Sequence, residues 1–556
     1  MEKPWERHYT ETVPCNLSYP EIVIGEMLRN TSKEYPKNTA LIFGGNKISY
    51  QELDHLVDSF ACGLFKLGVR KGNRVALLLP NCPQMVIAFY SIFRLGAIAV
   101  PANPMYQEKE IAYQIINSGA ETLIALDLLY PRISSVKDQI KLKNVIITSI
   151  KEYLPPFKKM LYPIFQMRGD QKVKAGKGTG IFNFKDLIAE SLPDFPSVAI
   201  SPEDIAILQY SGGTTGISKG AELTHSNIVF NTCQICSWYY IIKKGEEVIL
   251  SILPLFHTYG IAVCMNLSIA TGSCMVLIPR FVPKDLLKAI QDYQVTFFPG
   301  IPGIYAALNS YKNIKKWDIS SVNYCISGSA PLPISVIEEF EKLTGGVIIE
   351  GYGLTESSPV THSNPVHRER KIGSIGLPLA DTDCKIVDIE DGKREIPAGE
   401  AGELCIKGPQ VMKGYWNMPS ETDHAIRDGW LYTGDIARID KDGYFYIIDR
   451  KKDMIISEGF NIYPNEIDEM VLKHPKIVDA AAVGVPDQLR GEKVVLYVVL
   501  KEGEVIRQEE ILGFCRDNLA KYKVPKKVVF KKELPKTPVG KVLRRVLREE
   551  ALKERK

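Results

Sequence analysis

Short, continuously apolar runs alternate with helical segments through the first two thirds of the sequence. The first run is "RVALLLPN" from Arg74; Pro83 then suits a first helical turn, apolar residues recur at helical spacing, and "AIAV" follows Gly96. Similar runs occur at 122–126, 144–148, 204–210, 248–253, 274–278, 295–298, 322–327 and 346–350. Because strands that are apolar throughout are buried on both faces, the pattern predicts an α/β fold with mainly parallel sheet covered by helices.

The pattern of apolar and turn residues in the sequence changes after about residue 370. Short strands with turn residues follow, and Asp442-Gly443 is a strong hairpin signal, so antiparallel sheet is expected there. Beyond Arg450 the pattern predicts a small α+β unit with its own core. The chain of 556 residues also exceeds the size of a single hydrophobic core. We therefore predict a large domain at 1–451, with a β-rich part at about 370–451, and a smaller domain at 452–556.

The composition excludes several classes of protein. A net charge of +4 leaves nucleic-acid binding without an electrostatic footprint. No apolar run approaches the ~20 residues that span a bilayer, and no secretory signal is visible, so a cytoplasmic protein is expected. Residues 151–178 carry seven Lys/Arg against two acids. We interpret this segment as solvated surface, with weak peripheral contact to anionic lipid as the alternative.

The eleven cysteines do not indicate disulfides, because they are scattered through apolar contexts. Cys233 and Cys236 form a CxxC, but no second pair lies at the spacing that a zinc site needs. The flanking residues read as a helix. We therefore predict that both thiols are buried on a helix face and hold no metal.

The stretch "YSGGTTGISKG" at 210–220 has an unusual density of small and polar residues. It holds four glycines, two threonines, two serines and one lysine, and it follows the predicted strand at 204–210. Glycines let backbone N–H groups approach an anion, and the hydroxyls and the lysine add donors. The spacing differs from that of a P-loop, because Ile217 and Ser218 separate the glycine from Lys219. A phosphate chain fits this inventory.

Four further motifs accompany this stretch: "GYGLTESSP" (351–359), "YTGDIARID" (432–440), "DRKKDMIISEGFNIYPNEIDE" (449–469) and "PKTPVGKVLRR" (535–545). In order and approximate spacing the five motifs resemble those of the adenylate-forming superfamily, which includes acyl-CoA synthetases, aryl-CoA ligases, firefly luciferase and peptide-synthetase adenylation domains. The resemblance covers nearly the whole chain and is strongest to medium- and long-chain fatty acyl-CoA ligases. It implies α/β subdomains with a small β-barrel, followed by a mobile C-terminal α+β domain.

The resemblance also implies ATP, Mg²⁺ and CoA as the cofactors. Thr355 would face the α-phosphate. Glu356 would hold the metal, because a carboxylate beside a triphosphate needs a cation between them. The phosphate loop implied by the family comprises Ser211, Gly212, Gly213, Thr214, Thr215, Gly216 and Lys219. The implied adenine and ribose contacts are Tyr352, Ser329, Ala330, Asp435 and Arg450.

Lys541, in "TPVGK", is the residue implied to catalyse the first step, with its ammonium between the acid's carboxylate and the α-phosphate. Its place on the small domain implies that this domain must swing in to catalyse. The family then rotates the domain about a hinge, which Lys452 matches by position. The rotation presents the segment around Gly459 to the pantetheine of CoA, and this glycine allows close passage of the backbone.

His257, in "LPLFHTYG", matches a family motif at the acid-binding end, and we expect it to line the carboxylate site rather than act as an acid or base. Glycines would leave room for the acid beside the sheet, and no charged residue would pair with a polar tail, so an apolar acid is favoured. The implied pocket comprises Phe256, Tyr259, Val263, Gly300, Ile301, Gly328 and Gly351.

The sequence thus predicts an enzyme that activates a medium- to long-chain fatty acid to acyl-AMP and then transfers it to CoA. An aryl-CoA ligase of the 4-coumarate or benzoate type is the nearest alternative. A luciferase-like oxygenase and a carrier-loading adenylation enzyme use the same adenylate and are further alternatives. The expected partners are small molecules and not nucleic acid, and a homodimer is left open.

Overall fold

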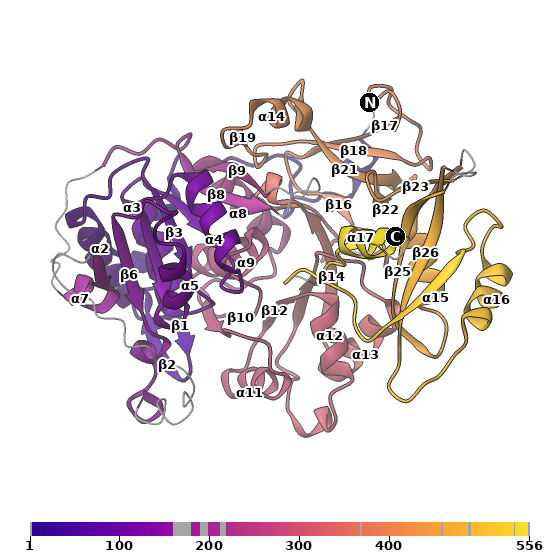
Figure 1. Cartoon of the computed structure of the whole chain (residues 1–556). Coiled ribbons are helices and arrows are strands. Elements are labelled where there is room, and N and C mark those ends of the chain that lie inside the picture. The colour runs from indigo at the N-terminus through magenta and orange to yellow at the C-terminus, as the bar shows by residue number, and fades with distance from the viewer. Residues whose placement is uncertain are drawn as a thin grey trace.

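The computed structural model describes residues 3–159, 180–189, 198–211, 218–366, 370–457, 460–487, 491–538 and 540–553. Within these ranges the strands form four sheets. In Figure 1 the N-terminal sheet lies at the left, a second sheet extends from the centre to the lower left, and an antiparallel sheet lies at the top. The sheet of the C-terminal unit, drawn in yellow, lies at the right (Figure 1).

The N-terminal sheet confirms the predicted βαβ unit, in which β3 and β4 are parallel and α3 (Pro83–Arg94) connects them. Its strands, in spatial order, are β19 (Gly414–Tyr415), β9 (Lys219–Thr224), β8 (Ile205–Ser211), β4 (Ile98–Pro101), β3 (Arg74–Leu78), β5 (Thr122–Leu126), β6 (Asn144–Thr148) and β7 (Ile181–Asn183). The strands from β8 to β7 are parallel. β9 turns back antiparallel to β8, so the glycine-rich stretch connects a hairpin.

Both faces of this sheet are buried, as continuously apolar strands require. Val75 and Leu77 of β3 join the main core, whereas Ala76 and Leu78 point to a second cluster on the opposite face. This alternation follows from the two-residue repeat of a strand. The second cluster is covered by α4 (Glu108–Ser118) and α5 (Tyr130–Ser135), which also contact each other.

The central sheet is parallel at its centre and antiparallel at both edges. Its strands, in order, are β16 (Leu377–Pro378), β15 (Val360–Ser363), β14 (Val347–Gly353), β13 (Tyr324–Ser327), β12 (Phe297–Gly300), β10 (Val248–Ser251), β11 (Cys274–Leu277), β1 (Thr39–Phe43) and β2 (Asn46–Ser49). Antiparallel pairing therefore begins at β14 and β15, somewhat earlier than the change of pattern near residue 370 indicated. Helices α11 (Pro283–Tyr293), α12 (Pro302–Asn309) and α13 (Ile334–Thr344) follow its parallel strands.

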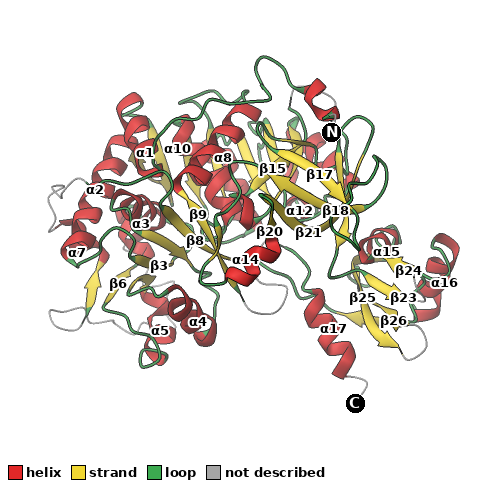
Figure 2. Ribbon diagram, turned by 90° about the horizontal axis from the view of Figure 1, so that it is seen from above, coloured by secondary structure: helices red, strands yellow, loops and turns green. Residues whose placement is uncertain are grey.

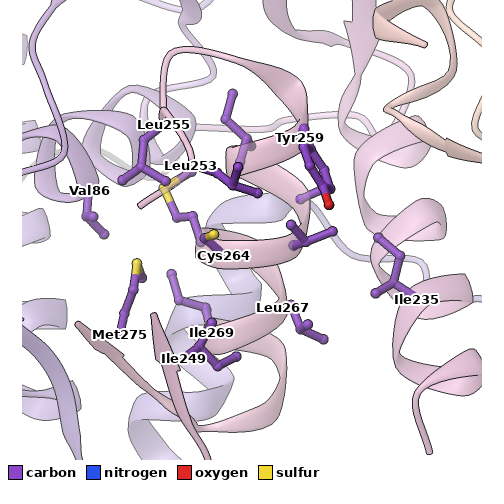
Figure 3. Packing of buried hydrophobic residues seen from close by; sticks show 14 of the residues in the cluster. Val86, Ile235, Ile249, Leu253, Leu255, Tyr259, Cys264, Leu267, Ile269 and Met275 are labelled. Atoms are coloured by element: carbon purple, nitrogen blue, oxygen red, sulfur yellow. The ribbon is translucent and has the colours of Figure 1, made fainter. Parts of the chain in front are cut away.

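The helices between the two large sheets make up much of the core. Contacts join α1 (Ile24–Glu34) to α2 (Tyr50–Lys66), α3, α8 (His225–Trp238) and α10 (Leu267–Thr271), and Figure 2 shows α1, α8 and α10 grouped together. Two short segments, α9 (Thr258–Gly260) and the π-helical η4 (Ile261–Asn266), lead into α10. Figure 3 shows the side chains of Tyr259, Cys264 and Leu267 on this helical stretch among apolar side chains of the neighbouring helices and strands.

The predicted antiparallel region and its hairpin are confirmed. The strands are β17 (Asp383–Val387), β18 (Gly402–Lys407), β20 (Ile426–Arg427), β21 (Trp430–Ile439) and β22 (Phe445–Arg450), and every pairing among them is antiparallel. Asp442 and Gly443 form the turn between β21 and β22, and Gly443 has a φ of +87°, which favours glycine. Helix α14 (Pro419–Ala425) precedes this hairpin and contacts β19.

The C-terminal unit has its own sheet and its own apolar clusters, one on each face. Its elements are β23 (Ile455–Ser457), β24 (Phe460–Ile462), α15 (Pro464–Val471), β25 (Ile477–Asp487), β26 (Gly491–Leu500), α16 (Gln508–Asn518), β27 (Lys527–Lys531) and α17 (Arg544–Lys553). The division of the chain at residue 451 stays a prediction.

The cysteines that the sequence singled out lie on α8 as free thiols. Burial raises the pKa of Cys233 to about 11 and that of Cys236 to about 12, so both stay protonated at neutral pH. Among the described helices, none is both long and apolar enough to cross a membrane.

Candidate active site

The hairpin of β8 and β9 places Lys219 at the start of β9, and Ser211, the last residue of β8, is its backbone partner. The Lys219 ammonium forms an ion pair with the Glu421 carboxylate of α14. It also lies over the ring of Tyr415, with 5.2 Å between Nζ and the ring centroid. The predicted phosphate-loop residues Gly212, Gly213, Thr214, Thr215 and Gly216 fall outside the described residues.

The turn that follows β14 carries Thr355 and Glu356 in a short 3₁₀ helix, η6 (Thr355–Ser357). The Tyr415 hydroxyl donates a hydrogen bond to Glu356 Oε1 at 2.8 Å. The backbone N–H of Met412 donates to the Glu356 carbonyl oxygen, also at 2.8 Å. These two bonds fix the carboxylate and the backbone of Glu356 to the segment that includes β19.

Asp435, Arg450 and Tyr352 form one polar cluster. Asp435 of β21 and Arg450 of β22 are direct partners across the hairpin, and 3.1 Å separates Arg450 Nε from Asp435 Oδ1. The Tyr352 hydroxyl donates to Asp435 Oδ2 at 2.6 Å. Burial and the nearby Asp435 carboxylate raise the pKa of Tyr352 well above its usual range, so the phenol remains a donor. The structure therefore brings together three residues that the sequence predicted as nucleotide contacts.

Lys541 lies in a tight loop before α17. The backbone N–H of Lys541 donates to Thr537 Oγ1 at 3.1 Å, and the N–H of Thr537 donates back to the Lys541 carbonyl at 2.8 Å. Gly540 has a φ of +81°, which favours glycine at this turn. Burial, with a further contribution from the Arg450 guanidinium, lowers the pKa of the Lys541 ammonium to about 7.

A cleft of about 940 Å³ opens between the large part of the molecule and the C-terminal unit. On one side it is lined by α4 and the end of β8, and on the other by the Lys541 loop and the start of α17. Of the predicted site residues, Phe256, His257, Thr355, Arg450, Lys452 and Lys541 line this cleft. These residues of the cleft come from four separate sequence motifs.

A smaller cavity of about 60 Å³ lies beside the cleft and shares His257 and Thr355 with it. The imidazole accepts a hydrogen bond at Nδ1 from the backbone N–H of Tyr259 at 3.2 Å, and burial lowers the pKa of His257 to about 4. The ring is therefore neutral at pH 7 and carries its proton on Nε2. This Nε2–H can donate a hydrogen bond to an oxygen of a bound acid. The predicted residues that line the cavity are His257, Tyr259, Val263, Gly328, Ser329, Gly351, Tyr352 and Thr355.

The expectation that glycines leave open space beside the sheet is wrong for Gly300, whereas Gly328 lines the smaller cavity but is closely packed. A Cβ at Gly300 would lie 2.8 Å from the Tyr305 ring, and one at Gly328 would lie 3.2 Å from the Tyr259 ring. The hydroxyl of Tyr259 also donates to the carbonyls of Gly300 and Ile326, each at 3.2 Å. Close packing of tyrosine rings therefore accounts for glycine at both positions.

Three residues predicted for the acid or adenine pocket are not among the described residues that line the two cavities. Ile301 lies beside the Lys541 loop, because a Cβ at Gly540 would be 3.3 Å from Ile301 Cδ1. Neither Ile301 nor Gly300 lines either cavity in the described part of the chain, and Ala330 also lines neither. The neighbouring Ser329 does line the smaller cavity and has a φ of +73°, which is strained for serine.

Sequence reasoning missed Tyr415, which contacts Glu356, and Glu421, which pairs with Lys219. Each contact joins residues that are far apart in the chain. Neither Tyr415 nor Glu421 belongs to one of the predicted motifs. The tyrosine in "GYWN" is one of 26 in the sequence, so residue type alone could not select it. Tyr239, which lines the smaller cavity from just beyond α8, was also missed.

The donor set around Glu356 fits Mg²⁺ bound together with a nucleotide. Within the described ranges no group of three or more His, Cys, Asp or Glu side chains could hold a metal by itself. Mg²⁺ is usually bound through one or two carboxylates plus substrate phosphates rather than by a cage of protein ligands. A single carboxylate that is already fixed by a hydrogen bond meets that requirement.

Comparison with known proteins defines the class. The sequence model of the AMP-binding enzyme family matches residues 28–416, and that of the AMP-binding enzyme C-terminal domain matches residues 466–541. The chain belongs to the AMP-binding enzyme family. A long-chain-fatty-acid–CoA ligase of Bacillus subtilis is 45% identical over 99% of this chain and 98% of that protein. A 4-coumarate–CoA ligase of Arabidopsis thaliana is 32% identical over 92% of this chain and 88% of that protein.

Solved structures of one relative match nearly the whole chain. MatB from Rhodopseudomonas palustris is 30% identical, and the match covers 96% of this chain and 100% of that chain in both its ATP-bound and its apo structure. The TM-score is 0.84 for the ATP-bound structure and 0.73 for the apo structure, so this chain is more similar in structure to the ATP-bound form.

Proposed function

We propose that this protein is an AMP-forming long-chain-fatty-acid–CoA ligase. In the first step a carboxylate oxygen of the acid attacks the α-phosphorus of ATP, and pyrophosphate leaves. In the second step the thiolate of CoA attacks the acyl carbon, and AMP leaves. Support comes from family membership, from the 45% identical Bacillus subtilis ligase and from the joint placement of the site residues. Such a reaction depends on charge compensation and positioning more than on a protein nucleophile.

The observation that carries the proposal is that Lys541, Thr355 and His257 line one cleft. In its protonated form the Lys541 ammonium neutralises the negative charge that gathers where the carboxylate meets the α-phosphate. The neutral His257 ring orients the acid through its Nε2–H. The smaller cavity beside His257 takes the part of the acid nearest the carboxylate.

In the proposal the nucleotide is held by residues of the large part of the molecule. Asp435 accepts hydrogen bonds from the ribose hydroxyls, and Arg450, which pairs with Asp435, contacts the ribose or the α-phosphate. Tyr352 stacks on adenine, and Lys219 with the glycine-rich loop binds the β- and γ-phosphates. Glu356 is the metal-holding residue of the proposal, and bound Mg²⁺ would supply charge neutralisation on the phosphates.

The second step requires a different arrangement of the C-terminal unit. We propose that rotation about Lys452 withdraws Lys541 and brings the segment around Gly459 to the pantetheine arm of CoA. Gly459 lies outside the described residues, so its role rests on the motif alone. Support for the proposal comes from the place of Lys541 on the C-terminal unit, in the cleft that this unit forms with the large part of the molecule.

The identity of the acid is the least constrained part of the proposal. Apolar lining and the Bacillus subtilis relative favour a long aliphatic acid. A cavity of about 60 Å³ is smaller than the 300–1,000 Å³ that ligand pockets usually have, so a long chain needs lining side chains to move. The small cavity and its aromatic lining favour the second candidate, an aryl-CoA ligase, and the Arabidopsis thaliana relative is of that type.

An acid panel with ATP, Mg²⁺ and CoA separates these candidates. We expect AMP release with laurate or palmitate to exceed that with acetate or 4-coumarate. A preference for 4-coumarate would support the second candidate. Acid-dependent turnover without CoA but with oxygen would indicate luciferase-like chemistry instead, and CoA-independent loading of a carrier protein would indicate an adenylation enzyme.

The Lys541→Ala variant tests the mechanism. We expect it to lose acid-dependent pyrophosphate exchange and to retain thioester formation from supplied acyl-AMP. Equal loss of both half-reactions would contradict the role given to Lys541.

The proposal further includes a cytoplasmic location. Homodimer formation is tested by sedimentation, and weak membrane contact is tested by flotation with anionic vesicles.

A further inference from the structure

The segment 412–416 connects three parts of the site that are distant in sequence. Its Met412 N–H donates to the carbonyl of Glu356, and its Trp416 N–H donates to the carbonyl of Gly220, each at 2.8 Å. The Trp416 indole N–H donates to the carbonyl of Asn117 at 3.2 Å. The segment therefore fastens the η6 turn, the hairpin strand β9 and the end of α4 to one another.

Tyr415 lies at the centre of this segment, and its side chain contacts both charged groups of the proposed phosphate site. Its hydroxyl donates to Glu356 Oε1 at 2.8 Å, and its ring centroid is 5.2 Å from Lys219 Nζ. The distance to the ammonium is that of a cation–π contact. One side chain thus contacts both the Glu356 carboxylate and the Lys219 ammonium, which is itself paired with Glu421.

The backbone holds this tyrosine firmly. Tyr415 pairs with Ala221 of β9, and its N–H donates to Thr422 Oγ1 of α14 at 2.9 Å. A Cβ at the preceding Gly414 would lie 2.8 Å from a side-chain carbon of Thr422, so only glycine allows α14 this close. The backbone of Tyr415 is therefore held by both β9 and α14, and these two elements set the direction of its side chain.

We propose that Tyr415 is a positioning residue that holds the Glu356 carboxylate in the orientation in which it would bind the metal. This rests on the proposed function. A hydrogen bond from an outer group to a ligating carboxylate typically changes metal affinity 10- to 100-fold when it is removed. The ring of the same residue lies beside Lys219, whose ammonium is paired with Glu421.

The Tyr415→Phe variant tests this, because it removes the hydroxyl and keeps the ring under Lys219. The measurement is binding of Mn²⁺ to the complex of enzyme and a nonhydrolysable ATP analogue, followed by electron paramagnetic resonance. We expect Mn²⁺ affinity to fall about tenfold, with little change in the affinity for the analogue without metal. Tyr9→Phe is the matched control, since it removes a phenol hydrogen bond of 2.7 Å to the Pro378 carbonyl.

A double variant shows whether the effect passes through the carboxylate. In the Glu356→Gln background, Tyr415→Phe is expected to cause no further loss of Mn²⁺ affinity. Equal Mn²⁺ affinity of wild type and Tyr415→Phe would overturn the proposal, as would additive losses in the double variant. Failure of the wild-type protein to bind the analogue at all would instead refute the proposed function.

Discussion

The lowered pKa of Lys541 leads to a prediction about the pH dependence of adenylation. In the proposed mechanism the ammonium is the active form, and it loses its proton as the pH rises through a value of about 7. The charged groups that set this value are Arg450, Lys452, Asp435 and Asp453, in addition to burial. We expect the Lys541→Arg variant to lose this dependence, because a guanidinium stays protonated throughout the pH range of the assay.

The magnitude follows from an ordinary titration curve. With a pKa of about 7, about half of the free enzyme carries the ammonium at pH 7, about a tenth at pH 8 and about a hundredth at pH 9. The logarithm of kcat/KM for adenylation should therefore fall with a slope approaching about −1 above neutrality. Bound ATP and acid are anions and favour the ammonium, so the corresponding fall in kcat should lie at higher pH.

The assay is pyrophosphate release from ATP and laurate between pH 6.5 and about pH 9.5, without CoA, so that the thiol does not titrate within the measured reaction. Lys541→Arg measured in the same buffers removes the contributions of ATP and metal from the comparison. We expect this variant to be about 10- to 100-fold slower near neutrality, because a longer planar group is misplaced, but to have a flat profile. Parallel profiles for the two proteins, or a wild-type rate that is level from pH 7 to pH 9, would refute the reasoning.

Two further predictions concern stability. Arg544→Ala removes the ion pair with buried Asp468. We expect the free energy of unfolding of the C-terminal unit, measured by urea titration, to fall by about 3–5 kcal/mol. A loss below about 1 kcal/mol, as for an exposed pair, would contradict this. Gly300→Ala places a Cβ 2.8 Å from the Tyr305 ring, and we expect a loss of about 1–3 kcal/mol by thermal unfolding. Gly303→Ala is the control, since its Cβ would meet no atom within 4 Å; equal effects of the two glycine variants would contradict the packing argument.

Much of the fold could be predicted because its signals are local. The βαβ unit around α3 and the turn at Gly443 each follow from a few neighbouring residues. The motifs likewise identified Lys541, Arg450 and Thr355, which the structure places around one cleft.

The interactions that hold those residues could not be predicted. The partners of Lys219 and Glu356 come from α14 and β19, and no spacing rule links such distant segments. The prediction of open space beside Gly300 was also wrong. A missing side chain was interpreted as open space, whereas the structure fills that space with a ring from α12. A glycine in a sequence shows only that a side chain is absent at that position. Whether a ligand or a neighbouring side chain fills the space depends on the tertiary packing.

The contacts of Lys451 bear on which contacts to the nucleotide would persist from adenylation to thioester formation. Its N–H donates to the Gly434 carbonyl at 2.9 Å, and its ammonium pairs with Glu403 at 2.8 Å, so the chain is tied to the large part of the molecule up to this residue. In the proposed rotation about Lys452, Asp435 and Arg450 would therefore stay together while Lys541 departs. The adenylate would keep its anchor at the ribose while its acyl carbon loses the lysine beside it, so that AMP is still held when the thioester forms.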